Sequence, residues 1–152
     1  MKYVSIIGGD VGSCDEEDCR NAEEIGKRLA KLGITIVCGG RGGVMKAVCK
    51  GAKSEDGTTI GILPSTDRNQ GNEYLDHTIV TDLGVLRNGL VVQNGDIVIA
   101  INGKYGTLSE IAIAQQYGKK ILGLGTWDLD AVDSCKDVNE LMQKFERYIN
   151  TK

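Results

Sequence analysis

The stretch that decides the fold is Asn94-Gly-Asp-Ile-Val-Ile-Ala-Ile-Asn-Gly-Lys-Tyr-Gly-Thr-Leu-Ser-Glu110. Residues 97–101 form an apolar, mostly β-branched run, which is typical of a central strand in a parallel sheet. The glycines that follow cannot continue this strand, and they allow a ligand to approach the backbone closely. We expect a helix to begin at Thr107. The unpaired N–H groups of its first turn would then form an anion site next to the glycine loop.

The same residues also fit a purely structural role. Thr107 and Glu110 match the pattern Thr-x-x-Glu, which is a helix capping box. Glu110 could therefore satisfy backbone groups at the helix start and contact no ligand. Spacing alone favours neither interpretation, because both place a carboxylate one turn into the helix.

Composition predicts one globular domain, residues 1–152, and excludes several classes of function. A 41% hydrophobic and 26% charged composition is ordinary for a globular chain. The net charge of -3 gives no basic surface for nucleic acid, and no apolar run reaches the length of a membrane span. Five cysteines without a C-x-x-C pair, and no visible secretory signal, predict free thiols and a cytoplasmic location. No metal site is expected, because ligand spacing is absent and His77 is the only histidine.

Strand and helix patterns alternate along the whole chain. This alternation predicts an α/β protein with a doubly wound parallel sheet and helices on both faces. The expected strands are residues 3–8, 34–38, 58–63, 77–81, 97–101 and 120–124; the expected helices are residues 13–32, 44–53, 83–93, 107–117 and 137–148. In such a sheet ligands bind beyond the carboxyl ends of the strands, where the strand order switches. We expect the loops after residues 3–8 and 97–101 to flank that point.

The first glycine loop, Gly8-Gly9-Asp10-Val11-Gly12, is a poor phosphate site. It does not match the G-x-G-x-x-G pattern of dinucleotide-binding folds. A capping box from Ser13 to Glu16 is expected to start the next helix, whose first turn carries carboxylates at each of residues 15–18. These charges would repel a phosphate, whereas contact of the loop with a sugar or a base remains open.

The second glycine loop, Gly39-Gly40-Arg41-Gly42-Gly43, suits an anion better. No acidic residue lies near the start of the helix that follows, and Arg41 adds a positive charge. Four glycines in five residues exceed what a tight turn needs, so ligand contact is favoured over a plain strand-to-helix turn.

Three further segments have two interpretations each. The polar residues 65–76 fit a mobile loop that closes over the site as a lid, or a solvated connector. His77 is a general base only by residue type, and we expect a structural or surface role for it. The helix at 107–117 is apolar over a wide arc, which suits packing on a partner subunit as well as on its own sheet.

Two motifs resemble a known superfamily. Cys38-Gly-Gly-Arg-Gly-Gly-Val-Met45 resembles the G-G-G-x-x-G-L-M motif, and residues 102–110 resemble the P-G-G-x-G-T-x-x-E motif, of the lysine decarboxylase-like or Lonely Guy superfamily. Its enzymes are phosphoribohydrolases, which cleave nucleoside 5'-monophosphates to the free base and ribose 5-phosphate. The run Tyr105-Gly-Thr-Leu-Ser-Glu-Ile-Ala112 and the Arg87-Asn88-Gly89 helix start look closer to molybdenum-cofactor carrier proteins of the same Rossmann-like group, which bind a pterin phosphate.

The chain departs from the hydrolase motifs at four positions. Cys38 and Lys104 stand where the hydrolases have glycine, Asn102 where they have proline, and Asn88 where they have lysine. Arg87, Glu110 and the glycine loop are retained. Loss of the lysine removes a cation, although Lys104 could supply one from the loop. These departures favour phosphate binding over hydrolysis.

The resemblance, together with the glycine loops, predicts one site. Arg87 and Glu110 are the expected catalytic residues if the chain is an enzyme. The predicted ligand-binding residues are Gly8, Gly9, Gly39, Gly40, Gly42, Gly43, Met45, Arg87, Asn88, Gly103, Lys104, Tyr105, Gly106, Thr107 and Glu110. Arg87 also has a structural alternative, an ion pair between helices at a dimer interface.

Three functions follow, in this order. The first is binding of a phosphate-bearing small molecule, either a nucleotide or a molybdenum-cofactor-type pterin, without turnover. The second is a nucleoside 5'-monophosphate phosphoribohydrolase, in which Glu110 stabilises an oxocarbenium-like ribose or activates water. The third is a sensor of a nucleotide signal. The resemblance also implies a homodimer or higher homo-oligomer.

Overall fold

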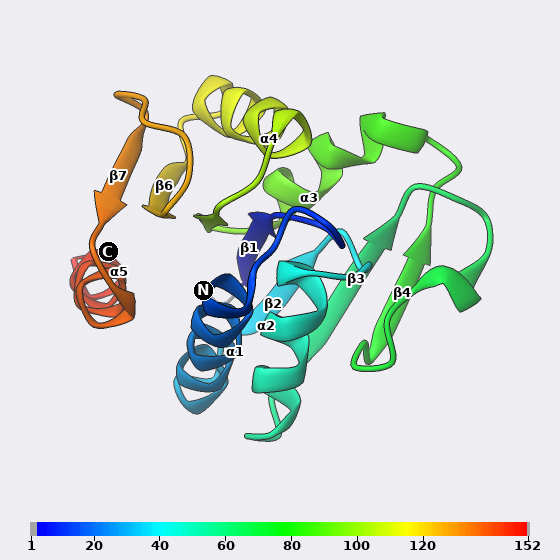
Figure 1. The fold of residues 1–152 in the computed structure, drawn as a ribbon, viewed down its shortest axis with the longest axis horizontal. Helices are drawn as coiled ribbons and strands as arrows, with labels where there is room; N and C mark the ends of the chain where they lie inside the picture. Colours follow the sequence, from blue (N-terminus) through cyan, green and yellow to red (C-terminus); the bar gives the residue numbers. More distant parts are fainter. Residues whose placement is uncertain (1–2, 152) are drawn as a thin grey trace.

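The computed structural model describes residues 3–151, which form one parallel sheet covered by helices (Figure 1). The strands are β1 Tyr3–Gly8, β2 Thr35–Cys38, β3 Thr59–Leu63, β4 His77–Val80, β5 Ile97–Ile101, β6 Lys120–Leu124 and β7 Val132–Cys135. The α-helices are α1 Glu16–Lys31, α2 Val44–Lys53, α3 Asn88–Asn94, α4 Tyr105–Gln116 and α5 Val138–Asn150; η1 Arg68–Gln70 and η2 Gly84–Arg87 are short 3-10 helices. The predicted α/β class is confirmed.

The strand order is β4-β3-β2-β1-β5-β6-β7, and every described pair is parallel. The order reverses direction between β1 and β5, which pair from Val4 with Ile97 to Gly8 with Ile101. The loops that follow these two strands therefore leave the same edge of the sheet at the switch point, as expected.

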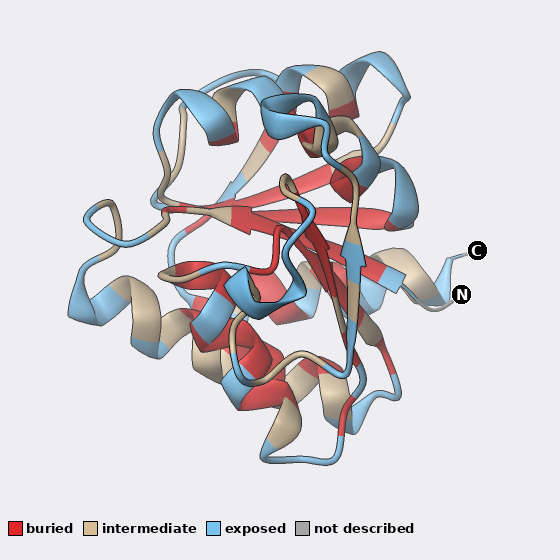
Figure 2. Ribbon diagram, turned by 90° about the vertical axis from the view of Figure 1, so that its right-hand side faces the viewer, coloured by how far each residue is buried: buried red, intermediate tan, exposed pale blue. Residues whose placement is uncertain are grey.

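Helices cover both faces of the sheet, whose strands are largely buried (Figures 1 and 2), and an apolar cluster lies on each face. Helices α1, α2 and α5 pack on one face, and α3 and α4 pack on the other. Strand β5 supplies both layers, because Ile97, Ile99 and Ile101 point to the first face while Val98 and Ala100 point to the second. All five side chains are at most 2% exposed, so the strand that precedes the glycine loop is fixed from both sides.

Three element starts differ from the sequence predictions. The capping box of α1 is formed by Asp15 and Asp18, not by Ser13 and Glu16. In place of the expected helix at 83–93 the chain forms η2 followed by α3, and Gly84, the first residue of η2, has a φ of +58°, which an α-helix does not allow. Helix α4 begins at Tyr105, two residues earlier than expected, and its N-cap residue Lys104 makes no side-chain capping hydrogen bond within the described part of the chain.

Strand β7 was missed. Its four residues, Val-Asp-Ser-Cys, lack an apolar run because only Val132 and Cys135 are buried. The strand lies at the edge of the sheet and pairs only with β6 among the described strands. Its Asp133 carboxylate instead binds Lys120 at 2.9 Å and Lys144 at 2.7 Å, which holds β7 to its neighbours.

The polar segment 65–76 is tied to the second glycine loop. The Asn72 N–H donates to the Gly40 carbonyl at 2.9 Å, and the Asn72 side-chain amide donates to the Arg41 carbonyl at 2.9 Å. Asp76 anchors the far end by accepting from Lys53 at 2.8 Å and from the Thr59 N–H at 2.9 Å. The segment thus lies beside the sheet edge, and its closure as a lid stays a prediction.

Candidate functional site

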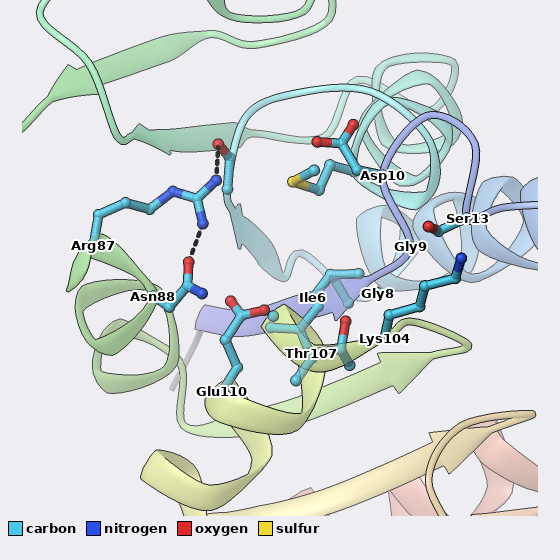
Figure 3. Close-up of a pocket in the computed structure, with 14 residues that line it drawn as sticks. Ile6, Gly8, Gly9, Asp10, Ser13, Arg87, Asn88, Lys104, Thr107 and Glu110 are labelled. Carbon is cyan, nitrogen blue, oxygen red and sulfur yellow. Dashed lines mark hydrogen bonds between the residues drawn. The ribbon is translucent and has the colours of Figure 1, made fainter. Parts of the chain in front are cut away.

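A hollow of about 210 Å³ opens at the switch point between β1 and β5 (Figure 3). It lies between the first two glycine loops, the start of α3 and the first two turns of α4. Its lining residues are Ile6, Ile7, Gly8, Gly9, Asp10, Ser13, Gly39, Met45, Arg87, Asn88, Lys104, Gly106, Thr107 and Glu110.

Glu110 is a buried carboxyl group in this hollow. It is 7% exposed, and no hydrogen bond or salt bridge reaches it from residues 3–151. Since Lys104 is the N-cap of α4, Glu110 is the sixth helical residue and lies beyond the turn that a capping box needs. The capping interpretation of Glu110 is wrong, because α4 begins two residues before Thr107.

Burial sets the protonation of Glu110. Removal from water raises the pKa of its carboxyl to about 8, although the nearby Arg87 guanidinium lowers that pKa. The group is therefore largely neutral at pH 7. A neutral carboxyl can donate a hydrogen bond or a proton, which an ordinary ionised glutamate cannot.

Arg87 enters the hollow from the junction of η2 and α3. Its Nη1 donates to the Asn88 side-chain oxygen, and its Nη2 donates to the Gly39 carbonyl at 3.4 Å. Its Nε is buried without a hydrogen-bond partner among residues 3–151, and burial lowers the pKa of the guanidinium. Asn88 is itself 7% exposed and donates to Ser109 Oγ at 3.4 Å, so α3 and α4 are linked behind the arginine. The guanidinium is therefore held at the wall of the hollow, and its Nε donor is unused.

The start of α4 forms another wall and presents free donors. The first intrahelical bond runs from the Leu108 N–H to the Lys104 carbonyl at 2.9 Å, so the N–H groups of residues 105–107 have no helical acceptor. The Thr107 side chain is 3% exposed, and no hydrogen bond to its hydroxyl is found within residues 3–151. No acidic residue lies in the first turn, and Lys104 adds a cation at the mouth. This helix start suits an anion.

The loop between β5 and α4 is fastened on both sides. Asn102 adopts a φ of +50°, a left-handed conformation that asparagine tolerates, and its side-chain amide donates to Asp18 at 2.6 Å. On the other side, Thr126 donates to the Asn102 carbonyl at 2.7 Å, and the Trp127 indole donates to the Lys104 carbonyl at 3.0 Å. The free N–H groups are therefore held in place before any ligand arrives.

Of the fourteen positions that the sequence predicted besides Glu110, nine line the hollow that contains Glu110. Gly8, Gly9 and Gly39 line the hollow together with Met45, Arg87, Asn88 and the α4 residues Lys104, Gly106 and Thr107. Gly42 lines a second hollow nearby. Whether these residues bind a ligand stays a prediction.

Four predicted positions line neither hollow, and each has a packing explanation. A Cβ at Gly40 would lie 2.9 Å from Leu63, and one at Gly43 would lie 2.2 Å from the Gly9 carbonyl. A Cβ at Gly103 would lie 2.1 Å from Thr107 Oγ1. Tyr105 is 79% exposed and packs on the Trp127 ring, with 5.9 Å between centroids. The richness in glycine thus reflects close packing between loops as much as room for a ligand.

Four lining residues were not predicted. Asp10 and Ser13 lie in the loop after β1, and Ile6 and Ile7 lie within β1. The position of Asp10 directly after Gly8 and Gly9 was a usable signal, because that loop was expected at the switch point. Nothing in the sequence marks Ile6 and Ile7 out from other strand residues.

A family model matches nearly the whole chain. The match covers residues 1–149 and describes the SLOG cluster4 family. The chain belongs to this family. Together with the relatives and solved structures described next, this match confirms the resemblance to the Lonely Guy superfamily and to its carrier branch.

Two curated proteins are similar in sequence to this SLOG cluster4 chain. An uncharacterized protein of Archaeoglobus fulgidus is 43% identical over 82% of the chain and 80% of its own length. The cytokinin riboside 5'-monophosphate phosphoribohydrolase of Mycobacterium tuberculosis is 34% identical over 70% of the chain and 57% of its own length.

Two solved structures share the whole fold. The molybdenum cofactor binding protein of Rippkaea orientalis superposes with a TM-score of 0.89 at 32% identity, covering 97% of each chain. The molybdenum cofactor carrier protein of Chlamydomonas reinhardtii gives a TM-score of 0.90 at 29% identity, covering 98% of each chain.

Two structural findings bear on other expectations. Within residues 3–151, none of the helices combines the length and apolar character that crossing a bilayer requires. In the same range, no group of three or more histidine, cysteine or acidic side chains is placed to hold a metal ion.

Proposed function

We propose that the chain binds a phosphate-bearing small molecule, a nucleotide or a molybdenum-cofactor-type pterin, at the hollow between β1 and β5. The observation that carries this proposal is the unused hydrogen-bonding capacity that converges there. The N–H groups of residues 105–107, the Thr107 hydroxyl and the Arg87 Nε all lack a partner within residues 3–151. The Arg87 Nε is buried, and a buried donor without an acceptor is costly. A ligand with several acceptor oxygens would satisfy it together with the donors at the start of α4.

The charges assign the phosphate to the α4 end of the hollow. Lys104 and the positive end of α4 lie there, whereas α1 starts with Asp15, Glu16, Glu17 and Asp18. Arg87 faces the same space from the opposite wall. A pterin phosphate fits these residues as well as a nucleotide does, because both ligands present the same phosphate end. The relatives that bind the molybdenum cofactor support this class of ligand.

The test compares a nucleotide with its nucleoside. AMP should raise the thermal midpoint of the protein, whereas adenosine, which differs only in the phosphate, should not. A Thr107→Val variant should lose the protection by AMP while it keeps its own midpoint within a few degrees. Equal protection by AMP and adenosine would contradict a phosphate site.

A second candidate is hydrolysis of nucleoside 5'-monophosphates, which the largely neutral Glu110 favours. The carboxyl could donate its proton to the departing base as the C1'–N bond breaks and the electron pair leaves with the base. Water would then add to C1' of the oxocarbenium-like ribose and lose a proton to the Glu110 carboxylate, giving ribose 5-phosphate and restoring the acid. Free base released from AMP over hours should be detected by chromatography, and Glu110→Gln should abolish it. If AMP protects the protein against heat but no free base is released, binding without hydrolysis is the function.

The third candidate, a sensor, would bind the nucleotide and also change its oligomeric state when the ligand is bound.

A further inference from the structure

The first hollow is too small for the whole ligand. Pockets that enclose small molecules usually measure about 300–1,000 Å³, and this one measures about 210 Å³. A second hollow of about 390 Å³ adjoins it and shares Asp10. Its lining residues are Asp10, Val11, Arg41, Gly42, Gln70 and Asn72. A ligand anchored by its phosphate at α4 can therefore extend past Asp10 into this second hollow.

Asp10 and Arg41 face each other there with bonding capacity to spare. Asp10 Oδ1 accepts from the Val11 N–H at 2.7 Å, while Oδ2 lies 3.9 Å from Arg41 Nε. That separation is an ion pair but not a hydrogen bond. Within residues 3–151, the Arg41 guanidinium and the Gln70 amide make no hydrogen bond. The second hollow thus combines a carboxylate acceptor with guanidinium donors.

This pairing disfavours a second phosphate. The Asp10 carboxylate would repel a phosphate placed beside Arg41. It would instead attract a group that presents two parallel N–H donors, as a guanidinium-like ring edge does. A carbonyl next to those donors would meet Arg41. The edge of a matching ligand should therefore present, in order, two hydrogen-bond donors to Asp10 and one acceptor to Arg41.

We propose that the second hollow binds a heterocycle with a 2-amino-4-oxopyrimidine edge, the edge that guanine and pterins share. The ring N–H and the 2-amino group donate to Asp10, and the oxo group accepts from Arg41. Adenine has an amino group beside a ring acceptor nitrogen, so it cannot offer two donors to Asp10. This inference rests on the proposed phosphate site, and it selects guanine-type and pterin ligands over adenine nucleotides.

The test is a calorimetric titration of the full chain with GMP, IMP and AMP, with ribose 5-phosphate in parallel. GMP should bind about tenfold or more tightly than AMP, the discrimination expected of one bidentate pair. IMP keeps the ring N–H and the oxo group but lacks the 2-amino group, so its affinity should lie between the two. Ribose 5-phosphate reports on the phosphate end alone.

Variants assign the preference to the two side chains. Asp10→Asn should lose the preference for GMP over AMP, because an amide offers one acceptor and one donor, and Arg41→Gln should weaken GMP and IMP more than AMP. Both variants should change the affinity for GMP more than they change the affinity for ribose 5-phosphate. Arg20 and Glu16 form a similar exposed pair at 3.8 Å on α1, so Arg20→Gln and Glu16→Gln are matched controls that should change nothing.

The outcomes separate the two proposals. Equal affinities for GMP, IMP and AMP, or tightest binding of AMP, alongside intact binding of ribose 5-phosphate, would overturn this inference and leave the phosphate site standing. A GMP preference that survives Asp10→Asn would also overturn it. No binding of ribose 5-phosphate or of any nucleotide would overturn the proposed function, and the ring subsite with it.

Discussion

At the scale of single residues, Glu110 shows how placement in a helix determines chemistry. Helix α4 begins two residues earlier than expected, and Glu110 is therefore a buried carboxyl group near Arg87 and not a capping residue. The sequence showed that Thr107 and Glu110 belong together, but spacing alone could not show which residue begins the helix. That start depends on Lys104, whose carbonyl accepts both the Trp127 indole and the Leu108 N–H.

Glu110 should make stability depend on pH. Its pKa is about 8 in the folded chain and near 4.5 ordinarily, so the folded state binds the proton more tightly. This contribution is fully present below pH 4.5 and is lost as the pH rises towards 8, at about 1.4 kcal/mol per pH unit. In Glu110→Gln this decline should disappear. Urea unfolding at pH 5, 6, 7 and 8 measures it, and identical pH profiles for the two proteins would contradict the buried acid.

Gly39 should control the position of Arg87. A Cβ at this residue would lie 2.7 Å from Arg87 Nη2 and 2.8 Å from Met45 Sδ. Both atoms end flexible side chains, so Gly39→Ala should fold, displace the guanidinium and weaken AMP binding about tenfold. In Gly89→Ala a Cβ meets nothing within 4 Å, and helix propensity predicts up to about 1 kcal/mol of added stability. Unchanged AMP affinity in Gly39→Ala would argue against a role for Arg87.

At the scale of elements, the sequence predicted the strands and helices that carry an extended run or a regular repeat of apolar residues. Strand β5 and helix α2 were predicted with their observed limits because their burial is continuous or clearly periodic. The start of α1, the split between η2 and α3, and strand β7 could not be predicted. The start of α1 depends on which of several competing caps forms, and β7 is held by ion pairs with Lys120 and Lys144 that its own four residues do not reveal.

The observed capping box of α1, Asp15 and Asp18, and the expected one, Ser13 and Glu16, predict different effects of mutation. Asp15 Oδ1 accepts from the Asp18 N–H at 2.8 Å, and Asp18 Oδ2 accepts from the Asp15 N–H at 3.2 Å. Asp15→Ala should therefore cost about 1 kcal/mol of stability. Glu16→Ala, which removes a 96% exposed side chain, should cost less than about 0.5 kcal/mol. Chemical denaturation at pH 7 compares them, and a larger loss for Glu16→Ala would restore the predicted cap.

At the scale of the molecule, the sheet brings residues from three distant segments to one edge. Asp10 and Arg41 lie in the loops after the neighbouring strands β1 and β2, and Arg87 ends η2; the three line the two hollows at this edge. The sequence predicted this edge from its glycine loops. It could not predict that the ligand space divides into two hollows joined at Asp10, because that division depends on where segment 65–76 lies.

Self-association remains a prediction at this scale. Helix α4 leaves an exposed Ala112 beside Leu108, Leu129 and Ala131 in a shallow, mainly apolar groove. If a second copy packs there, sedimentation equilibrium should give a mass near twice 16.3 kDa. Ala112→Glu should then shift the protein towards the monomer without changing its thermal midpoint by more than a few degrees. A monomeric wild-type protein at micromolar concentration would contradict this expectation.

The measurement that tests the phosphate site most directly is calorimetric titration of the protein with ribose 5-phosphate and with ribose. The two sugars differ only in the phosphate that the start of α4, Lys104 and Arg87 are proposed to hold. The proposed site predicts saturable binding of ribose 5-phosphate, no measurable binding of ribose, and at least a tenfold loss of affinity in both Thr107→Val and Arg87→Gln. Equal binding of the two sugars, or full affinity in both variants, would contradict it.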